Sequence, residues 1–145
     1  MAGSGTESNC KSVILGAAAG YGPDKVELFL RSLVRVNFEG RLVLFVYGRQ
    51  MRAMADFLRS ATPSLDVELV RVAHLDAHPK LVQSFFKRLL VILPAEKSLR
   101  LKGILLRFYG RPHVTRYFHY AAYLDAHPGF SQVLLTDVRD VVFQS

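Results

Sequence analysis

The sequence predicts an α/β fold in which a mostly parallel sheet is flanked by helices. Three short apolar runs, at residues 12–18, 42–47 and 65–70, alternate with two stretches whose apolar residues recur at helical spacing. Strands that alternate with helices in this way are typical of βαβ units, whose strands lie parallel. A last apolar run, at residues 133–135, leads directly into two aspartates. Because ligands of open parallel sheets bind outside the carboxyl ends of the strands, this run also predicts where a site would lie.

The composition limits the class of protein. The 145 residues suit one domain with a sizeable core, and 50% of them are hydrophobic while 21% are charged, as in globular proteins. The formal net charge of +7 favours phosphate-rich partners. The basic residues are dispersed, however, so no nucleic-acid partner is expected. The single cysteine, Cys10, excludes an internal disulfide and a cysteine-based zinc cluster.

The chain is expected to form one domain behind a short leader. Residues 1–11 are rich in Gly, Ser, Thr and Asn, so we expect them to be disordered, and residues 12–145 to form an α/β domain. The leader contains no signal-peptide core. The most apolar stretch, residues 89–93, is too short to span a bilayer. A cytoplasmic protein without a membrane span is therefore the expectation.

The amino-terminal part predicts a strand, a glycine turn and a helix. Residues 12–18 predict a central parallel strand. Gly16 lies in this run and Gly20 and Gly22 follow it, and glycine permits tight turns and close approach of the backbone to a ligand. Pro23 suits the first turn of a helix. Apolar residues at helical spacing then form its buried stripe: Val26, Phe29, Leu30 and Leu33.

A second strand, helix and strand follow. Residues 42–47 predict a strand because Val, Leu and aromatic residues dominate, and Gly48 ends it. A second amphipathic helix ends near residues 60–63, and its apolar residues are Met51, Met54, Phe57 and Leu58. In residues 65–70 apolar and acidic side chains alternate, which predicts a half-exposed strand near an edge of the sheet.

The middle of the chain is predicted to be helical. A broad apolar face runs through residues 81–93 and is ended by Pro94. Residues 99–109 continue as another helix that is basic on one side. Neither segment carries a pattern of residues that predicts chemistry.

A last helix and a last strand complete the domain. The helix covers residues 114–124 and is followed by His-Pro-Gly. Its aromatic residues are expected to pack rather than to perform chemistry: Tyr117, His119, Tyr120 and Tyr123. The apolar run at 133–135 then predicts a strand that is buried on both faces.

Asp137 and Asp140 follow this last strand. Aspartate is a poor strand former, so Asp137 marks the carboxyl end of the strand. Two carboxylates there offer hard oxygen ligands that suit Mg²⁺ or Mn²⁺, which proteins often hold by one or two carboxylates plus substrate phosphates. The alternative is a strand-end turn, in which the acids cap backbone amides and Arg139 pairs with one of them.

The glycines after the first strand match neither of two common phosphate motifs. A Walker loop needs Gly-Lys-Ser/Thr, whereas Gly22 is followed by Pro23, and the spacing of the dinucleotide fingerprint is also missing. The loop still allows close approach to a base or ribose, with Tyr21 as a stacking surface. The alternative is a plain strand-to-helix turn.

Two segments resemble those of a known group of enzymes. Residues 134–144, Leu-Leu-Thr-Asp-Val-Arg-Asp-Val-Val-Phe-Gln, resemble the acidic metal-binding motif of GT-A-type, nucleotide-sugar-dependent glycosyltransferases, and are closest to a branch that carries Asp-x-Arg-Asp. Residues 14–22, Ile-Leu-Gly-Ala-Ala-Ala-Gly-Tyr-Gly, are similar to the first strand and nucleotide loop of such enzymes. The commoner acidic motif is Asp-x-Asp, so it stays open which aspartate touches the metal. The likeness covers both ends of the chain and not the middle.

The resemblance implies a Rossmann-like nucleotide-binding half of a GT-A enzyme, incomplete at its carboxyl end, that transfers a sugar from a UDP- or GDP-linked donor to an acceptor. It implies Mn²⁺ or Mg²⁺ held by Asp137 and Asp140, with Asp137 also available to the ribose. It further implies that the nucleotide site includes Gly16, Ala17, Tyr21 and Arg116, where Arg116 would contact the diphosphate. No catalytic base is assigned. The rival is a non-catalytic or degenerate α/β module that binds a phosphate ligand.

Overall fold

The computed structural model describes residues 12–72 and 112–144, together with isolated positions between 81 and 92. These residues contain a single parallel sheet in the order β3-β2-β1-β4. Its strands are β1 (Ser12–Ala17), β2 (Arg41–Tyr47), β3 (Asp66–Val72) and β4 (Gln132–Asp137). The predicted α/β class with a parallel sheet is therefore confirmed for the described part of the chain.

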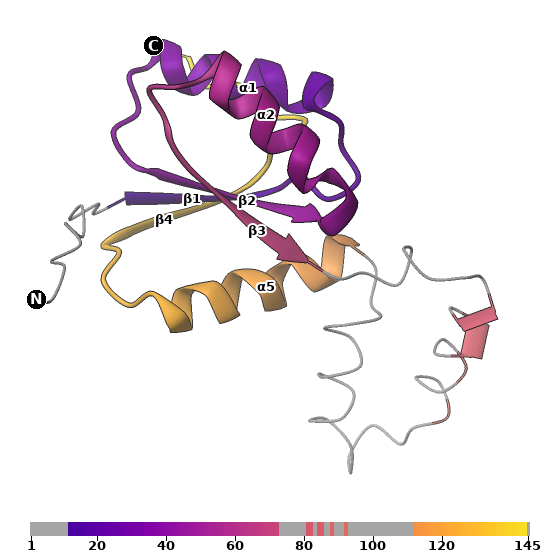
Figure 1. The fold of residues 1–145 in the computed structure, drawn as a ribbon. Helices are drawn as coiled ribbons and strands as arrows, with labels where there is room; N and C mark the ends of the chain where they lie inside the picture. The colour runs from indigo at the N-terminus through magenta and orange to yellow at the C-terminus, as the bar shows by residue number, and fades with distance from the viewer. Residues whose placement is uncertain are drawn as a thin grey trace, which may run out of the picture.

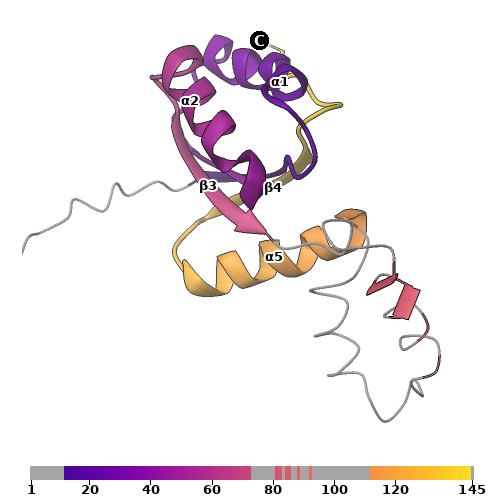
Figure 2. The same ribbon diagram turned by 45° about the vertical axis from the view of Figure 1, so that its right-hand side comes forward.

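Helices cover both faces of the sheet (Figure 1). The helices α1 (Pro23–Arg35) and α2 (Met51–Ala61) lie on one face and α5 (Pro112–Ala126) lies on the other, an arrangement that Figure 2 shows from a second direction. A short 3-10 turn, η1 (Gly48–Gln50), leads from β2 into α2. The predicted helix over 81–93 lies mostly outside the described residues, and the predicted helix over 99–109 and the leader 1–11 lie wholly outside them.

The core on the α1 side follows the predicted stripes. The buried apolar residues of the two helices are those that recur at helical spacing: Val26, Phe29, Leu30 and Leu33 of α1, and Met54 and Leu58 of α2. They pack against the residues of β1 and β2 that point to this face: Ile14, Leu42, Leu44 and Val46. Each side chain of this size contributes roughly 1.5–3 kcal/mol when it is fully buried. The helical periodicity in the sequence therefore identified this core.

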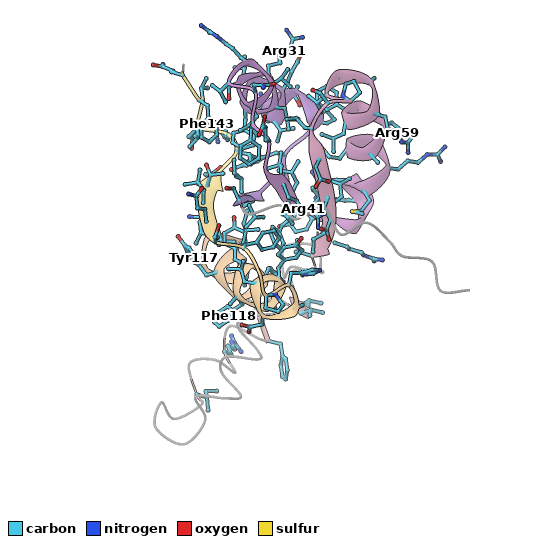
Figure 3. All side chains as sticks on the ribbon, turned by 90° about the vertical axis from the view of Figure 1, so that its left-hand side faces the viewer. Arg31, Arg41, Arg59, Tyr117, Phe118 and Phe143 are labelled. Atoms are coloured by element: carbon cyan, nitrogen blue, oxygen red, sulfur yellow. The ribbon has the colours of Figure 1, made fainter. Side chains whose placement is uncertain are left out.

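The core on the α5 side contains tyrosines. Tyr120 and Tyr123 are buried against Phe45, with ring centroids 5.0 Å and 6.1 Å from its ring. The hydroxyl of Tyr123 donates a hydrogen bond to Glu68 on β3 at 2.6 Å. The predicted packing role is confirmed for these two tyrosines, whereas Tyr117 is 52% exposed and meets the Tyr120 ring edge-on with centroids 6.1 Å apart. Figure 3 labels Tyr117 among the side chains of α5.

The sheet has two edges in the described part of the chain, and the sequence predicted one of them. β3 is an edge strand with partly buried residues, as expected from its alternation, and β1 is central. β4 forms the other edge. The prediction that residues 133–135 are buried on both faces is wrong, because the side chains of all three are exposed. Val133, Leu134 and Leu135 are 43%, 44% and 45% exposed. An apolar run in the sequence shows that a strand is hydrophobic, but it does not show how many strands or helices will pack against it.

Candidate functional site

The order of the strands reverses beside β1. From β1 the chain continues to β2 and β3 on one side, whereas β4 joins β1 from the other side. Open parallel sheets bind ligands outside the carboxyl ends of the strands at such a reversal, because the connecting loops diverge there. Ala17 at the end of β1 pairs with Asp137 at the end of β4. The loop after β1 that contains Gly20 and Gly22 (the glycine loop) and the turn at residues 137–140 (the acidic turn) therefore leave the sheet next to one another.

A cavity of about 190 Å³ lies at this reversal. Its walls come from the carboxyl ends of all four strands and from α5, and its aromatic and charged residues are Tyr21, Phe45, Tyr47, His119, Arg116 and Asp137. Ligand pockets in proteins usually measure about 300–1,000 Å³. This cavity is therefore large enough for one ring of a ligand, and the remainder of a nucleotide would extend past its rim.

The cavity brings together residues that the sequence predicted from separate segments. Ala17, Tyr21, Arg116 and Asp137 all line it, whereas Gly16, the fifth residue of the predicted nucleotide site, does not. Gly16 is buried on the opposite side of β1, where a Cβ atom would lie 2.5 Å from Cγ1 of Val138. Its lack of a side chain allows the chain after β4 to pack against β1.

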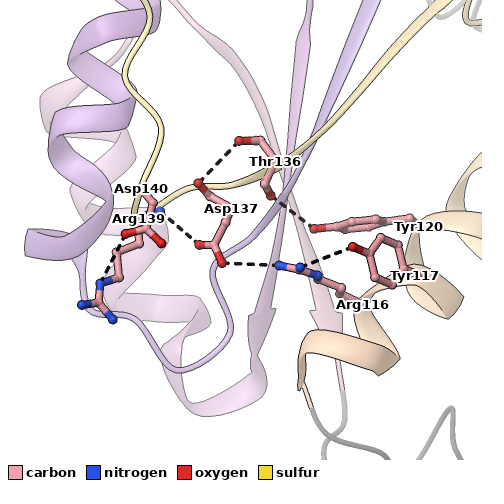
Figure 4. A network of polar contacts seen from close by, with 7 residues as sticks. All are labelled: Arg116, Tyr117, Tyr120, Thr136, Asp137, Arg139 and Asp140. Atoms are coloured by element: carbon pink, nitrogen blue, oxygen red, sulfur yellow. Dashed lines mark hydrogen bonds and ion pairs between the residues drawn. The ribbon is translucent and has the colours of Figure 1, made fainter.

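Asp137 is held on two sides (Figure 4). Its Oδ2 accepts a hydrogen bond from Nη1 of Arg116 at 3.3 Å, and its Oδ1 accepts one from the backbone N–H of Arg139 at 3.3 Å. The backbone N–H of Asp140 lies 3.4 Å from the carbonyl oxygen of Asp137. These contacts form the strand-end turn that the sequence left open as an alternative, and the same turn presents Asp137 to the cavity.

Asp140 lies outside the cavity lining. Its side chain is 73% exposed, and Oδ1 is 3.8 Å from Nε of Arg139. After Asp140 the chain is anchored on α1, because the Phe143 ring packs on Phe29 with centroids 5.9 Å apart and the Phe143 N–H bonds to Ser32 Oγ at 3.0 Å. Asp140 therefore sits in a turn whose first residue lines the cavity and whose continuation is fixed on α1.

The two carboxylates fit a divalent cation only if a ligand shares it. Among the described residues, no group of three or more His, Cys, Asp or Glu side chains is arranged to hold a metal ion. Asp137 and Asp140 would supply the one or two carboxylates typical of Mg²⁺ sites that substrate phosphates complete. Each carboxylate also contacts a guanidinium, from Arg116 and Arg139 respectively. The donor set thus fits an ion shared with a bound phosphate better than a preformed metal cage.

Arg116 places a positive charge at the cavity wall. Burial opposes this charge, but the hydrogen bond to the Tyr117 hydroxyl at 3.4 Å and the nearby Asp137 carboxylate raise the pKa of Arg116 above its ordinary value. The guanidinium also lies over the Tyr117 ring, 5.1 Å from its centroid. Its Nε is buried and has no hydrogen-bond acceptor within the described residues. Within that part of the chain, the Nε–H of Arg116 is therefore a donor without a partner.

Tyr120 forms a neutral wall behind this charge. Burial raises the pKa of Tyr120 to about 12, although Arg116 acts in the opposite direction. The hydroxyl therefore keeps its proton at neutral pH and lies 3.5 Å from the carbonyl oxygen of Thr136, to which it donates. Arg116 therefore places a cation beside Asp137, and Tyr120 adds an uncharged hydroxyl close to it.

Gln50 fixes the glycine loop, and sequence analysis did not identify it. Its Oε1 accepts hydrogen bonds from the N–H groups of Gly20 at 2.9 Å and Tyr47 at 3.2 Å, while its Nε2 donates to the carbonyl oxygen of Tyr21 at 2.6 Å. Gly20 has φ of 94°, which glycine adopts without strain. This side chain holds the loop against the end of β2 and so positions two tyrosine walls of the cavity.

Sequence reasoning did not assign Phe45, Tyr47 or Gln50 to the site. The sequence contains a signal for Phe45 and Tyr47 but none for Gln50. Phe45 and Tyr47 alternate with Val46 along β2, so period-two spacing places both on the face that α5 covers. Gln50 lies in a turn, where no periodicity marks a residue. Its role became visible only from its three hydrogen bonds.

The fold and the cavity define the class of this protein as an α/β chain with a four-stranded parallel sheet and a polar and aromatic cavity at the strand reversal. No family model matches the chain, and neither the curated proteins nor the solved structures gave a match. In the part of the chain that the structure describes, none of the helices has the length and apolar character needed to cross a membrane.

Proposed function

We propose that this chain binds a nucleotide sugar at the cavity and acts as a metal-dependent glycosyltransferase of the GT-A type. One observation carries the proposal: a single cavity joins the two segments that resemble those enzymes. Ala17 and Tyr21 come from the glycine loop, and Asp137 comes from the acidic turn. Arg116 of α5 belongs to the same lining.

The lining supports a division of the ligand into two parts. Tyr21, Phe45 and Tyr47 offer ring surfaces, and an aromatic pair contributes roughly 0.5–1.5 kcal/mol beyond the area that it buries. A base or sugar ring would therefore occupy the enclosed volume. Arg116 would donate to the diphosphate, because a guanidinium matches phosphate oxygens in a fork geometry.

Mn²⁺ or Mg²⁺ would be held by Asp137, Asp140 and oxygens of the diphosphate. When bound, such an ion stabilises the negative charge that develops on the leaving diphosphate. The residues of the chain itself bind and orient the donor, and Arg116 would stabilise the same charge by donating N–H groups. No described side chain is assigned as the base that activates an acceptor.

Calorimetry with UDP and GDP, with and without Mn²⁺, tests this proposal. We expect one of the two nucleotides to bind when Mn²⁺ is present, and Asp140→Ala to abolish that binding. Asp125→Ala is the matched control, because Asp125 is an exposed carboxylate on α5 outside the cavity lining. Equal binding without metal, or by Asp140→Ala, would contradict the assigned role. Metal-dependent binding without release of UDP or GDP from any sugar donor would favour the non-catalytic module.

A further inference from the structure

We propose that Arg116 is an internal counter-ion that blocks Asp137 until an anionic ligand takes its place. In this arrangement the Arg116 guanidinium occupies the carboxylate oxygen that a divalent cation needs. A phosphorylated ligand that pairs with Arg116 frees this oxygen, so that anion binding and cation binding promote one another. The ligand class rests on the proposed function, whereas the switch itself rests on the ion pair.

The ion pair is loose enough to exchange. Charge-assisted N–H···O bonds usually measure about 2.7–2.9 Å, but the Arg116–Asp137 bond is 3.3 Å and the Arg116–Tyr117 bond is 3.4 Å. The two side chains of the ion pair are 25% and 34% exposed. The Nε of Arg116 has no acceptor among the described residues, so a phosphate group that reoriented the guanidinium could satisfy more of its donors than Asp137 does.

Both oxygens of Asp137 are engaged while the pair is intact. Oδ1 accepts the backbone N–H of Arg139, and Oδ2 accepts Nη1 of Arg116. A divalent cation at Oδ2 would lie close to the guanidinium and be repelled by it. Asp140 offers a weak substitute, because it is one carboxylate at 73% exposure beside Arg139. Metal affinity in the absence of an anion should therefore be low.

Thermodynamic linkage makes the coupling reciprocal. If an anion at Arg116 increases the affinity for a cation at Asp137, the cation increases the affinity for the anion by the same factor. Couplings between sites are typically about 5–150-fold. Removal of the Arg116 charge should therefore tighten cation binding at Asp137, and removal of the Asp137 charge should tighten anion binding at Arg116. This is the reverse of the usual effect of removing a side chain from a site.

Two variants of the full chain test the switch. Arg116→Gln should tighten the binding of Mn²⁺ alone by at least about fivefold, measured by electron paramagnetic resonance of free Mn²⁺. Asp137→Asn should tighten the binding of inorganic pyrophosphate by a similar factor in metal-free buffer, measured by calorimetry. Circular dichroism checks that each variant is folded.

A matched charge control separates the switch from general electrostatics. The Arg49 guanidinium lies over Tyr47, 5.7 Å from the centroid of this wall residue. Arg49→Gln removes the same charge, and its effect on Mn²⁺ should stay below about twofold because solvent and salt screen a charge outside the ion pair. Unchanged or weaker Mn²⁺ binding by Arg116→Gln, or equal tightening by Arg49→Gln, would overturn the switch.

The failure of the switch is distinguishable from the failure of the proposed function. The function fails when the wild-type chain binds neither UDP nor GDP in the presence of Mn²⁺. The switch fails when Arg116→Gln does not bind Mn²⁺ more tightly than the wild type, and this affinity is measured without any nucleotide.

Discussion

Ala17 and Asp137 are paired in register on the neighbouring parallel strands β1 and β4, although they come from opposite ends of the domain. Because the strands are parallel, their carboxyl ends meet at one edge of the sheet, and the segments that leave them enclose a common cavity. The position of Asp137 at the cavity therefore depends on the pairing of β4 with β1.

Gly16 tests this contact between the two ends. Gly16→Ala should lower the free energy of unfolding by about 1–3 kcal/mol, because overpacking of a core costs this much. The new Cβ atom would lie 2.5 Å from Val138 Cγ1 and 3.1 Å from Leu44 Cδ2. Urea unfolding measures the loss. Val138→Ala removes the competing methyl groups, so the double variant should lose less than the sum of the two single losses; strictly additive losses would contradict this packing.

Gln50 tests the positioning of the glycine loop. Gln50→Ala removes two acceptor contacts and one donor contact, so it should speed hydrogen exchange of the Gly20 amide and lower stability by about 1–3 kcal/mol. Amide exchange followed by NMR measures the first effect. Gln132→Ala is the control, since Gln132 accepts a bond from Ser12 Oγ at the amino end of the sheet. Unchanged Gly20 exchange in Gln50→Ala would show that the loop is fixed by other contacts.

Leu134 tests the edge position of β4. Leu15→Ala should cost about 2–5 kcal/mol because Leu15 is fully buried, whereas Leu134→Ala should cost less than about 1 kcal/mol because Leu134 is 44% exposed. Both losses are measured by urea unfolding of the isolated chain. Equal losses would mean that the outer side of β4 is covered in solution.

Tyr123 tests the stability of the fold at alkaline pH. Burial, followed by the hydrogen bond to Glu68, raises the pKa of Tyr123 to about 12, above its ordinary value of 10.0. The folded state therefore holds a proton that the unfolded state releases. The resulting stability is fully present below about pH 10 and is lost as the pH rises towards about 12. Tyr120, with a pKa also raised to about 12, acts in the same direction.

Tyr123→Phe removes one of these two titrating groups. The variant should be less stable than the wild type at pH 9, because it lacks the bond to Glu68, but it should lose less stability between about pH 10 and about pH 12. Urea unfolding across this range measures both effects. Tyr117→Phe, at a tyrosine that is 52% exposed, is the control. An alkaline loss in Tyr123→Phe as steep as that of the wild type would show that Tyr123 does not carry this dependence.

For the described residues, the sequence by itself determined the strands and helices and the edge of the sheet where a site would lie. The buried stripe of α1, the central position of β1 and the partial exposure of β3 all follow from the spacing of apolar residues, which is a local property of the chain. The same logic placed Asp137 at the end of a strand. The resemblance to GT-A enzymes then grouped Ala17, Tyr21 and Asp137 in one nucleotide site, and all three line the same cavity.

The tertiary structure alone decided which neighbours each element has. It placed β4 at an edge, buried Tyr120 and Tyr123 in place of Tyr117, and turned Gly16 away from the cavity. It also set Arg116 against Asp137 and gave Gln50 its contacts to the glycine loop. Each of these features depends on contacts between segments that are distant in the chain, and the periodicity of a single segment carries no information about which other segment will pack against it.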